Sequence, residues 1–600
     1  MKHFYTLILS LLMLHTTTAQ TDKRLKGIEK ELNALLQLTK APGFAVAVVE
    51  KDKVIYSSGF GYRDYENKIP VDANTLFAIG SSTKAFTCAI LGQLKNEGKL
   101  SFDDSPLKYV PELKFYNNDL NGNIIIEDLM CHRTGLPRHD ISWYLFPTHS
   151  KDSLIQRIKY QEPSTGLRQQ WQYNNFMFMT QGVIAEKITG KSWEDNIKER
   201  FFAPLGMTRS NTSIQEMKKA SNAAFGYNVK NDKIVKTDYY DIAAMSPAGS
   251  INSSANDMAN WLKIWLNKGK FNAKEILPES YITDAMTSHA VANGGLPSEE
   301  FPNTFMSNYG YGWFLMSYKG QYRVEHGGNI DGFSATVTFY PGSNIGIVVL
   351  VNQNNSSLPT FVRNTIADRL LNVKRTDWVD YYKKQLEKSK KEKEEPKKEE
   401  TEKAKEENHT PSHRLGSYTG LYSNPGYGTF EVAIKNDSLF ATLPQKKYYL
   451  KSKFYDIFDP FEVKNEKIEI TDENDGIYFN FSTNDAGDIS GVTLKMEQTL
   501  DHPIIFKRKP KEIAVDAETL NKYTGEYVIK GMTVKVSVKN SKLNLFVPGQ
   551  PEYELIATGK NMYVITTLEG FKVEFISNEN GSVKEMKLHQ PNGEFTAVKK

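Results

Sequence analysis

The chain has 600 residues, of which 40% are hydrophobic and 12% aromatic, and its formal net charge is +4. This length favours several domains over a single one, and the composition is that of an ordinary globular protein. The charge is nearly balanced for so long a chain, which gives no reason to expect a nucleic-acid partner.

The first residues have the pattern of an export signal. The stretch "MKHFYTLILSLLMLHTTTAQ" has a basic start, an apolar centre and a small-residue end at Thr17-Thr18-Ala19. We predict a signal peptide over residues 1–19, cleaved after Ala19. The apolar centre is too short for a comfortable membrane span, and no later run is long enough to be one. We therefore expect an exported protein, periplasmic or secreted, with no transmembrane segment in the mature chain.

Residues 20–380 mix helical and strand patterns. Residues 22–39 predict an amphipathic helix with an apolar face formed by Leu25, Ile28, Leu32, Leu35 and Leu36. Residues 43–62 and residues 332–353 each predict two strands, and a last helix follows near residues 361–371. Strands at both ends with helices between them indicate an α+β domain, in which one antiparallel sheet is closed by both termini and carries a large helical insertion.

The stretch "FAIGSSTKAFTCAIL" places Ser81 three residues before Lys84. On a helix these positions share a face, so the lysine amine can reach the serine oxygen. A desolvated lysine can take a proton, and a helix N-terminus adds N–H groups beside the serine. The alternative is that Ser81 only caps a helix. A second match to the spacing, from Ser105 to Lys108, contains Pro106 and predicts a turn or helix start.

Two further motifs follow in the chain. One is Tyr173-Asn174-Asn175 in "QYNNFMFMTQGVIAEKITGKSW", and the other is His326-Gly327-Gly328 in "VEHGGNIDGFSA". Taken alone, the tyrosine is typical of a core aromatic, the asparagine of a turn and the histidine of a strand end.

In this order the motifs resemble those of the serine β-lactamase and penicillin-binding superfamily. The branch in question includes class C β-lactamases, D,D-carboxypeptidases, D-aminopeptidases and esterases, whose members share S-x-x-K, then Y-x-N, then K-T-G or H-x-G. The stretches "LMCHRTGLPRHD", "FFAPLGMTRS" and "PAGSINSSANDMANWL" also look like that branch. The resemblance covers roughly residues 25–372. It implies a β-lactamase/transpeptidase-like sheet flanked by helices.

The resemblance also implies roles for the motif residues. Ser81 would be the acylated nucleophile, Lys84 its base and Tyr173 the proton relay to the leaving group. Asn175 would hold the acyl amide and orient Lys84. His326 stands where many relatives have lysine, next to Gly328. The backbone N–H groups of Ser81 and Asn329 would form the oxyanion hole.

Several features qualify this reading of the sequence. His326 lacks the permanent charge of a lysine, which shifts the expectation from a β-lactamase toward a peptidase or esterase, and an inflection near pH 6.5 is expected if the histidine titrates during turnover. Cys131 and Thr134 stand where relatives usually have Thr and Ser. Whether Cys88 and Cys131 pair is open, and two small buried residues are favoured. No cofactor is implied, and His409 and His413 lack the company a metal site needs.

The remaining chain divides into a charged linker and two repeats. Residues 381–411 include a Lys/Glu run that predicts a solvated linker, with a charged docking arm as the lesser alternative. Beyond it, "YTGLYSNPGYGTFEVAIKNDSLF" at Tyr418 returns as "YTGEYVIKGMTVKVSVKNSKLNL" at Tyr523. Each copy has Y-T-G-x-Y, an alternating run and a turn that begins at Lys-Asn. We predict two small all-β modules, barrels (lipocalin-like) or sandwiches, over residues 412–510 and 511–600.

The combined expectation is an exported serine hydrolase acting through an acyl-serine. The expected substrates are small peptides, including peptidoglycan-like peptides that contain D-amino acids. A carboxylesterase, a β-lactamase and a slowly reacting penicillin-binding sensor remain alternatives. The expected partners are therefore a small peptide, amide or ester, with β-lactams as a further candidate.

Overall fold

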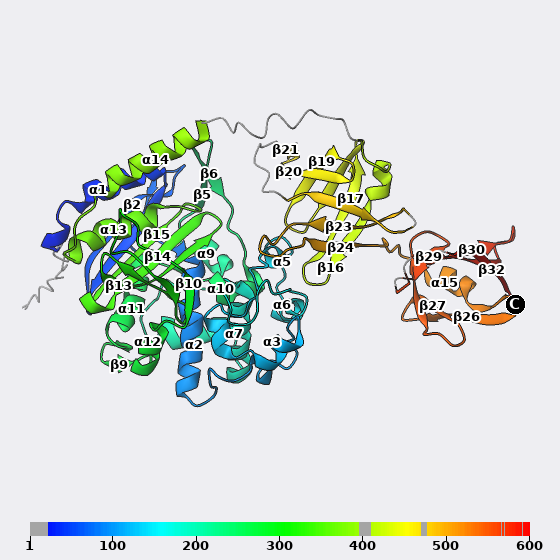
Figure 1. Cartoon of the computed structure of the whole chain (residues 1–600), viewed down its shortest axis with the longest axis horizontal. Helices are drawn as coiled ribbons and strands as arrows, with labels where there is room; N and C mark the ends of the chain where they lie inside the picture. Colours follow the sequence, from blue (N-terminus) through cyan, green and yellow to red (C-terminus); the bar gives the residue numbers. More distant parts are fainter. Residues whose placement is uncertain are drawn as a thin grey trace, which may run out of the picture. The chain divides into compact units, whose positions relative to one another are not determined.

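The computed structural model describes residues 22–394, 410–469, 477–485, 487–565, 567–568, 570–590 and 592–600 (Figure 1). The predicted signal peptide lies outside these ranges, as does much of the predicted linker. The chain forms two compact units. One contains residues 22–138, 149–156 and 165–394, and the other contains residues 139–148, 157–164 and the described residues from 410 onward. The predicted domain boundaries remain a prediction.

The first unit is built on a nine-stranded antiparallel sheet. In spatial order its strands are β10 (Ala290–Asn293), β11 (Ser307–Tyr309), β12 (Phe314–Tyr318), β13 (Gln321–Ile330), β14 (Phe333–Tyr340), β15 (Ile345–Val351), β1 (Gly43–Glu50), β2 (Lys53–Asp64) and β3 (Ile69–Pro70). The first long strand pairs with the last, from Phe44 opposite Val351 to Glu50 opposite Ile345. This confirms the prediction that both ends of the domain close one sheet.

Helices cover both faces of this sheet. The helices α1 (Ile28–Thr39) and α13 (Leu358–Leu370) share a core with Phe44, Val46 and Val48, while α11 (Ala255–Leu266) packs on the opposite face, where Leu262 lies against Gly346 (Figure 1). Neighbouring residues of a strand point to opposite faces, so an apolar run such as "GFAVAVV" is buried on both sides.

The expected helical insertion lies between residues 80 and 289. Its helices include η2 (Gly80–Thr83), α2 (Lys84–Asn96), η3 (Pro106–Lys108), α3 (Asn118–Asn123), α4 (Ile126–Met130), α6 (Lys151–Ile158), α7 (Asn175–Thr189), α8 (Trp193–Ile197), α9 (Ile214–Lys219), α10 (Ser246–Gly249) and α12 (Glu279–Ala285). After α13, the helix α14 (Trp378–Glu394) runs into the Lys/Glu stretch, and its Trp378 is buried in the same core as α1. Among the described residues, no helix is long and apolar enough to cross a membrane.

The two repeats are closed β-barrels, which confirms the expectation of two all-β modules. The first contains β16 (Gly420–Asn424), β17 (Gly428–Lys435), β18 (Ser438–Thr442), β19 (Lys447–Phe454), β20 (Ile457–Lys464), β22 (Phe479–Thr483), β23 (Ile489–Leu494) and β24 (Ile504–Lys509), with the short β21 (Lys467–Ile468) attached to β20. The second follows α15 (Ala517–Tyr523) and contains β25 (Gly525–Ile529), β26 (Met532–Lys539), β27 (Lys542–Phe546), β28 (Tyr553–Ala557), β29 (Met562–Ile565), β30 (Lys572–Ser577), β31 (Val583–Gln590) and β32 (Gly593–Lys599).

The repeated motif makes the same contact in both barrels. Tyr422 Oη donates to the backbone carbonyl of Tyr418 at 2.7 Å, and Tyr527 Oη donates to that of Tyr523 at the same distance. The turns after Lys435 and Lys539 each contain two consecutive residues with positive φ, which is the conformation of a tight hairpin. The repeated sequence therefore specifies a shared local structure.

Candidate active site

Ser81 lies at the start of the buried helix that follows the strand β4 (Phe77–Ala78). It belongs to η2, where no side chain caps the helix, so the interpretation of Ser81 as a cap is wrong. By contrast, the hydroxyl of Ser105 accepts a hydrogen bond from the backbone N–H of Leu107, as expected for the second match to the spacing. Ser81 is therefore placed by the backbone around it and keeps its hydroxyl beside Lys84.

Lys84 is fully buried, and its amine is held by three groups. Its Nζ lies 3.1 Å from Ser81 Oγ, 2.7 Å from Asn175 Oδ1 and 2.8 Å from the carbonyl oxygen of Ala248. The two carbonyl-type oxygens can only accept hydrogen bonds. A neutral amine that donates to both of them turns its lone pair toward Ser81. This arrangement fits a general base for the serine hydroxyl.

Tyr173 lies just before α7, which begins where Asn174 accepts a hydrogen bond from the backbone N–H of Met177. The Lys84 amine is 4.8 Å from the centre of the Tyr173 ring, and the Arg138 guanidinium carbon is 4.6 Å from it. His132 packs against the same ring, tilted by 35°, with centroids 4.3 Å apart. The Arg138 cation beside the phenol stabilises negative charge that develops on its oxygen, which suits a group that passes a proton on.

The edge of β13 approaches Ser81 at two glycines. A Cβ on Gly328 would lie 1.8 Å from the carbonyl oxygen of Ile79, and one on Gly80 would lie 2.9 Å from the backbone nitrogen of Asn329. Gly80 also has a φ of +49°, which side chains rarely adopt. These glycines let the backbone amides of Ser81 and Asn329 come near each other, as an oxyanion hole would require.

His326 is buried and neutral in this arrangement. Its Nδ1 lies 2.6 Å from the carbonyl oxygen of Gly327, so that nitrogen must carry the hydrogen and donate it. Its Nε2 therefore accepts a hydrogen bond from Tyr309 Oη, at 2.9 Å. Burial, with the nearby charge of Lys84, lowers the pKa of His326 to about 3. The expected titration near pH 6.5 is thus replaced by a histidine that stays neutral over the physiological range.

The structure brings all the sequence-predicted motifs into one region and adds residues that sequence reasoning missed. His132 and Arg138 lie within "LMCHRTGLPRHD", and Ala248 lies within "PAGSINSSANDMANWL". Both stretches resemble the family, so these three residues could have been chosen from the sequence as site candidates. No sequence motif indicated Tyr309, because strand pairing in the sheet brings it next to His326. Cys88 and Cys131 are buried thiols with no disulfide between them.

The sheet with helices on both faces, and a serine whose hydroxyl adjoins a buried lysine, are the features expected of the β-lactamase-like class of serine hydrolases. Residues 28–371 match the β-lactamase family, and this match covers more than half of the chain. The chain therefore belongs to the β-lactamase family. Residues 404–508 match a second family, which is described as a domain of unknown function (DUF3471).

Two relatives and one solved structure are similar to this chain. Protein flp of Staphylococcus aureus (strain N315) is 28% identical over 361 residues, which are 60% of this chain and 69% of that protein. The unguisins hydrolase ungD of Aspergillus violaceofuscus is 25% identical over 457 residues, 70% of this chain and 79% of that protein. The octameric penicillin-binding protein homologue from Pyrococcus abyssi has a TM-score of 0.52 at 22% identity. The alignment covers 80% of this chain and 99% of that one, and shows a shared fold.

Proposed function

We propose that this protein is an exported serine hydrolase that cleaves amide bonds in small peptides through an acyl intermediate on Ser81. Peptidoglycan-like peptides that contain D-amino acids are the substrate class we favour. The observation that carries the proposal is the position of the Lys84 amine, which adjoins the Ser81 hydroxyl while two carbonyl oxygens take its hydrogens.

The geometry supports the following sequence of steps. Lys84 takes the hydroxyl proton as Ser81 Oγ bonds to the substrate carbonyl carbon, and the backbone N–H groups of Ser81 and Asn329 stabilise the oxyanion. Tyr173 gives its proton to the leaving nitrogen as the C–N bond breaks, and Lys84 returns a proton to Tyr173. Water then attacks the acyl-serine ester, which releases the acid and restores the serine hydroxyl.

Replacing the serine tests the proposal. Ser81→Ala should lower kcat/KM by at least about a thousandfold, because loss of a nucleophile removes most of the catalysis. Ser105→Ala is the matched control, since Ser105 has the same spacing to a lysine but caps the short helix η3, and it should retain wild-type turnover. A fluorophosphonate probe should label the wild type and not Ser81→Ala. Activity of Ser81→Ala within tenfold of the wild type would contradict the proposal.

A carboxylesterase with the same nucleophile is the second candidate, and the state of His326 favours it over a β-lactamase. A neutral histidine offers no permanent cation for a penicillin-type carboxylate. Turnover of D-amino-acid peptides, short p-nitrophenyl esters and a chromogenic cephalosporin separates the three activities. We expect the cephalosporin to react most slowly. His326→Lys should raise the rate of cephalosporin hydrolysis relative to that of the esters.

The pH dependence of stability checks the state assigned to His326. Its pKa is about 3 in the folded chain but about 6.5 when unfolded, so the unfolded chain binds the extra proton. The stabilising effect of the neutral histidine is therefore complete above about pH 6.5 and is lost as pH falls toward 3, by up to about 1.4 kcal/mol per pH unit. Denaturant unfolding should show a shallower acid decline for His326→Gln, and equal slopes would contradict the assignment.

Export of the protein is part of the proposal and rests on residues 1–19, outside the described ranges. N-terminal sequencing of protein recovered outside the cytoplasm should begin at Gln20. Recovery of the uncleaved chain from the cytoplasm would contradict it.

A further inference from the structure

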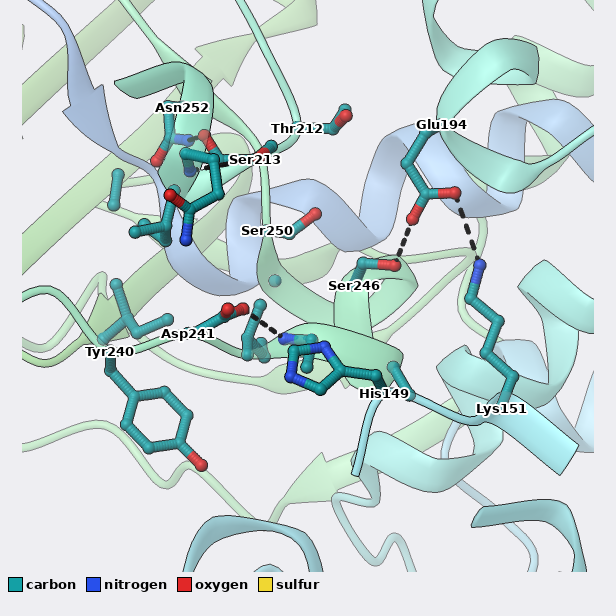
Figure 2. A pocket seen from close by; sticks show the side chains of 18 of the residues that line it. His149, Lys151, Glu194, Thr212, Ser213, Tyr240, Asp241, Ser246, Ser250 and Asn252 are labelled. Carbon is teal, nitrogen blue, oxygen red and sulfur yellow. Dashed lines mark hydrogen bonds and ion pairs between the residues drawn. The ribbon is translucent and has the colours of Figure 1, made fainter. Parts of the chain in front are cut away.

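A cavity of about 680 Å³ lies in the first unit (Figure 2). Its lining includes Gly249, the residue after the carbonyl that holds Lys84, and a Cβ on Gly249 would lie 3.6 Å from the carbonyl carbon of Gly80. One lining residue therefore packs against the backbone just before Ser81. Its volume is in the range of small-ligand sites.

The cavity contains two buried oxygens without hydrogen-bond partners in the described structure. They are Ser250 Oγ and Asn252 Oδ1, on residues that are 7% and 0% exposed. Figure 2 shows the Ser250 hydroxyl directed into the open space between Ser246 and Thr212. The amide nitrogen of Asn252 donates to Asn211 Oδ1 at 2.8 Å, which orients its side chain. An unpaired buried oxygen is unfavourable, and the Asn252 oxygen can only accept, so both atoms suit a ligand that donates hydrogen bonds.

The charged groups around the cavity are mostly acidic. Four carboxylates line it, from Asp152, Glu186, Glu194 and Asp241, against a single lysine, Lys151.

The lysine is neutralised locally. Lys151 Nζ lies 2.5 Å from Glu186 Oε1 and 3.4 Å from Glu194 Oε2, and the other oxygen of Glu194 accepts from Ser246 at 2.5 Å. Across the cavity, Asp241 accepts only a backbone N–H among the contacts described, that of Ala243 at 2.9 Å. The field inside the cavity therefore favours a cation.

We propose that this cavity binds a protonated primary amine carried by the acyl part of the substrate. The ammonium group donates to Ser250 Oγ and Asn252 Oδ1, and the surrounding carboxylates supply the opposite charge. The acyl side is assigned because Tyr173, which protonates the leaving group, does not line the cavity. The substrate class is then a peptide, amide or ester whose acyl part has a free N-terminus or a basic side chain. This inference rests on the proposed hydrolase function.

Three p-nitrophenyl esters of matched length test the charge preference: 6-aminohexanoate, heptanoate and the adipate monoester. After subtraction of spontaneous hydrolysis, kcat/KM should be about tenfold higher for the amino ester than for heptanoate, and lowest for adipate. Ser250→Ala and Asp241→Asn should each reduce the amino-to-heptanoate ratio at least threefold. Glu199→Gln is the control, because Glu199 is an exposed carboxylate paired with Lys191 outside the cavity, and it should leave the ratio unchanged.

The outcomes separate the two proposals. Ser81-dependent turnover with equal rates for the three esters, or ratios unaffected by Ser250→Ala and Asp241→Asn, would overturn the amine site and leave ordered water as the partner of the two oxygens. If no ester reacts faster than with Ser81→Ala, the hydrolase proposal fails. Calorimetric titration with n-hexylamine then tests amine binding independently of catalysis. The wild type should bind the amine and Ser250→Ala should bind it more weakly. No binding to the wild type would show that the amine site is wrong.

Discussion

The two barrels share a repeated sequence but fill their cores differently. The buried core residues of the second barrel all lie between Leu520 and Ala597, among the described part of the chain. The core of the first also includes Leu145 and Phe146, which are 7% and 2% exposed and come from the β-lactamase-family sequence more than 250 residues earlier. One copy is thus self-contained, whereas the other is completed by a distant segment.

The difference originates in one hairpin. In the first copy, Pro425-Gly426-Tyr427 join β16 to β17, which begins at Gly428. In the second copy, Lys530-Gly531 join β25 to β26, which begins at Met532. A Cβ on Gly428 would lie 2.6 Å from the Phe146 ring, and one on Gly426 would lie 2.9 Å from Tyr160. In the second barrel Met532 is 45% exposed. The two glycines of this hairpin leave room for the residues of segments 139–148 and 157–164.

Polar contacts reinforce the anchor of that segment. Ser142 Oγ donates to the carbonyl of Gly426 at 2.6 Å, and the backbone N–H of His139 donates to Glu497 Oε2 at 2.9 Å. His139 directly follows Arg138, whose guanidinium lies over the Tyr173 ring. The comparison teaches that a repeat in sequence does not imply equal roles, since only the first copy fixes a segment that leads to the active site.

Truncation should separate the copies most clearly. A fragment of residues 20–510 lacks only the self-contained barrel and should keep ester turnover within about twofold. A fragment of residues 20–380 exposes Leu145 and Phe146, whose burial contributes roughly 1.5–3 kcal/mol each, so it should aggregate or lose most activity. The sequence alone predicts that the short fragment is active. Solubility and turnover of the two fragments measure the effect, and full activity of the short one would refute the anchoring role.

Core truncation in each barrel should follow the same division. Phe146→Ala and the matched Phe575→Ala each remove a buried ring and should destabilise the barrel concerned by about 3–5 kcal/mol. Thermal unfolding with turnover measured in parallel is the test. We expect Phe146→Ala to lower turnover and Phe575→Ala to leave it unchanged. An equal effect of both variants on turnover would show that the barrels act alike.

One glycine in the corresponding hairpin of each barrel allows backbone strain to be compared with a steric clash. Gly428 and Gly531 both have positive φ, +151° and +81°, but only Gly428 faces a neighbouring ring, while a Cβ on Gly531 meets nothing within 4 Å. Gly531→Ala should therefore cost about 1 kcal/mol from backbone strain, and Gly428→Ala about 1–3 kcal/mol more from overpacking against Phe146. The denaturant midpoints of the two variants measure these stability losses. Equal losses would mean that Phe146 does not contact Gly428.

The shared tyrosine contact should give the smallest and most equal effects. Tyr422→Phe and Tyr527→Phe each remove one hydrogen bond to a carbonyl four residues earlier, at a cost of about 1 kcal/mol. Unfolding free energies of the two variants should agree within about 0.5 kcal/mol. A clear difference would mean that the repeated motif is not equivalent in the two barrels.

The sequence by itself determined the features that depend on short spacing. The apolar stripe of residues 22–39 predicted α1, the alternation at Phe430 and Val432 predicted barrel strands, and the Lys-Asn pairs predicted hairpin turns. The order of the Ser81, Tyr173 and His326 motifs predicted the candidate site through its resemblance to a family. These features can be predicted from the sequence because helix and strand periodicity acts over a few residues.

Only the tertiary structure decided what depends on burial and long-range contact. The alternating runs continue to Ile434 and Val538, yet these are 44% and 37% exposed, because the third position of each run passes beyond the barrel core. The neutral state of His326 follows from its burial beside Lys84, and Phe146 enters a barrel that begins far along the chain. Such long-range contacts cannot be predicted from the spacing of nearby residues, because desolvation and packing depend on the folded environment and not on the adjacent sequence.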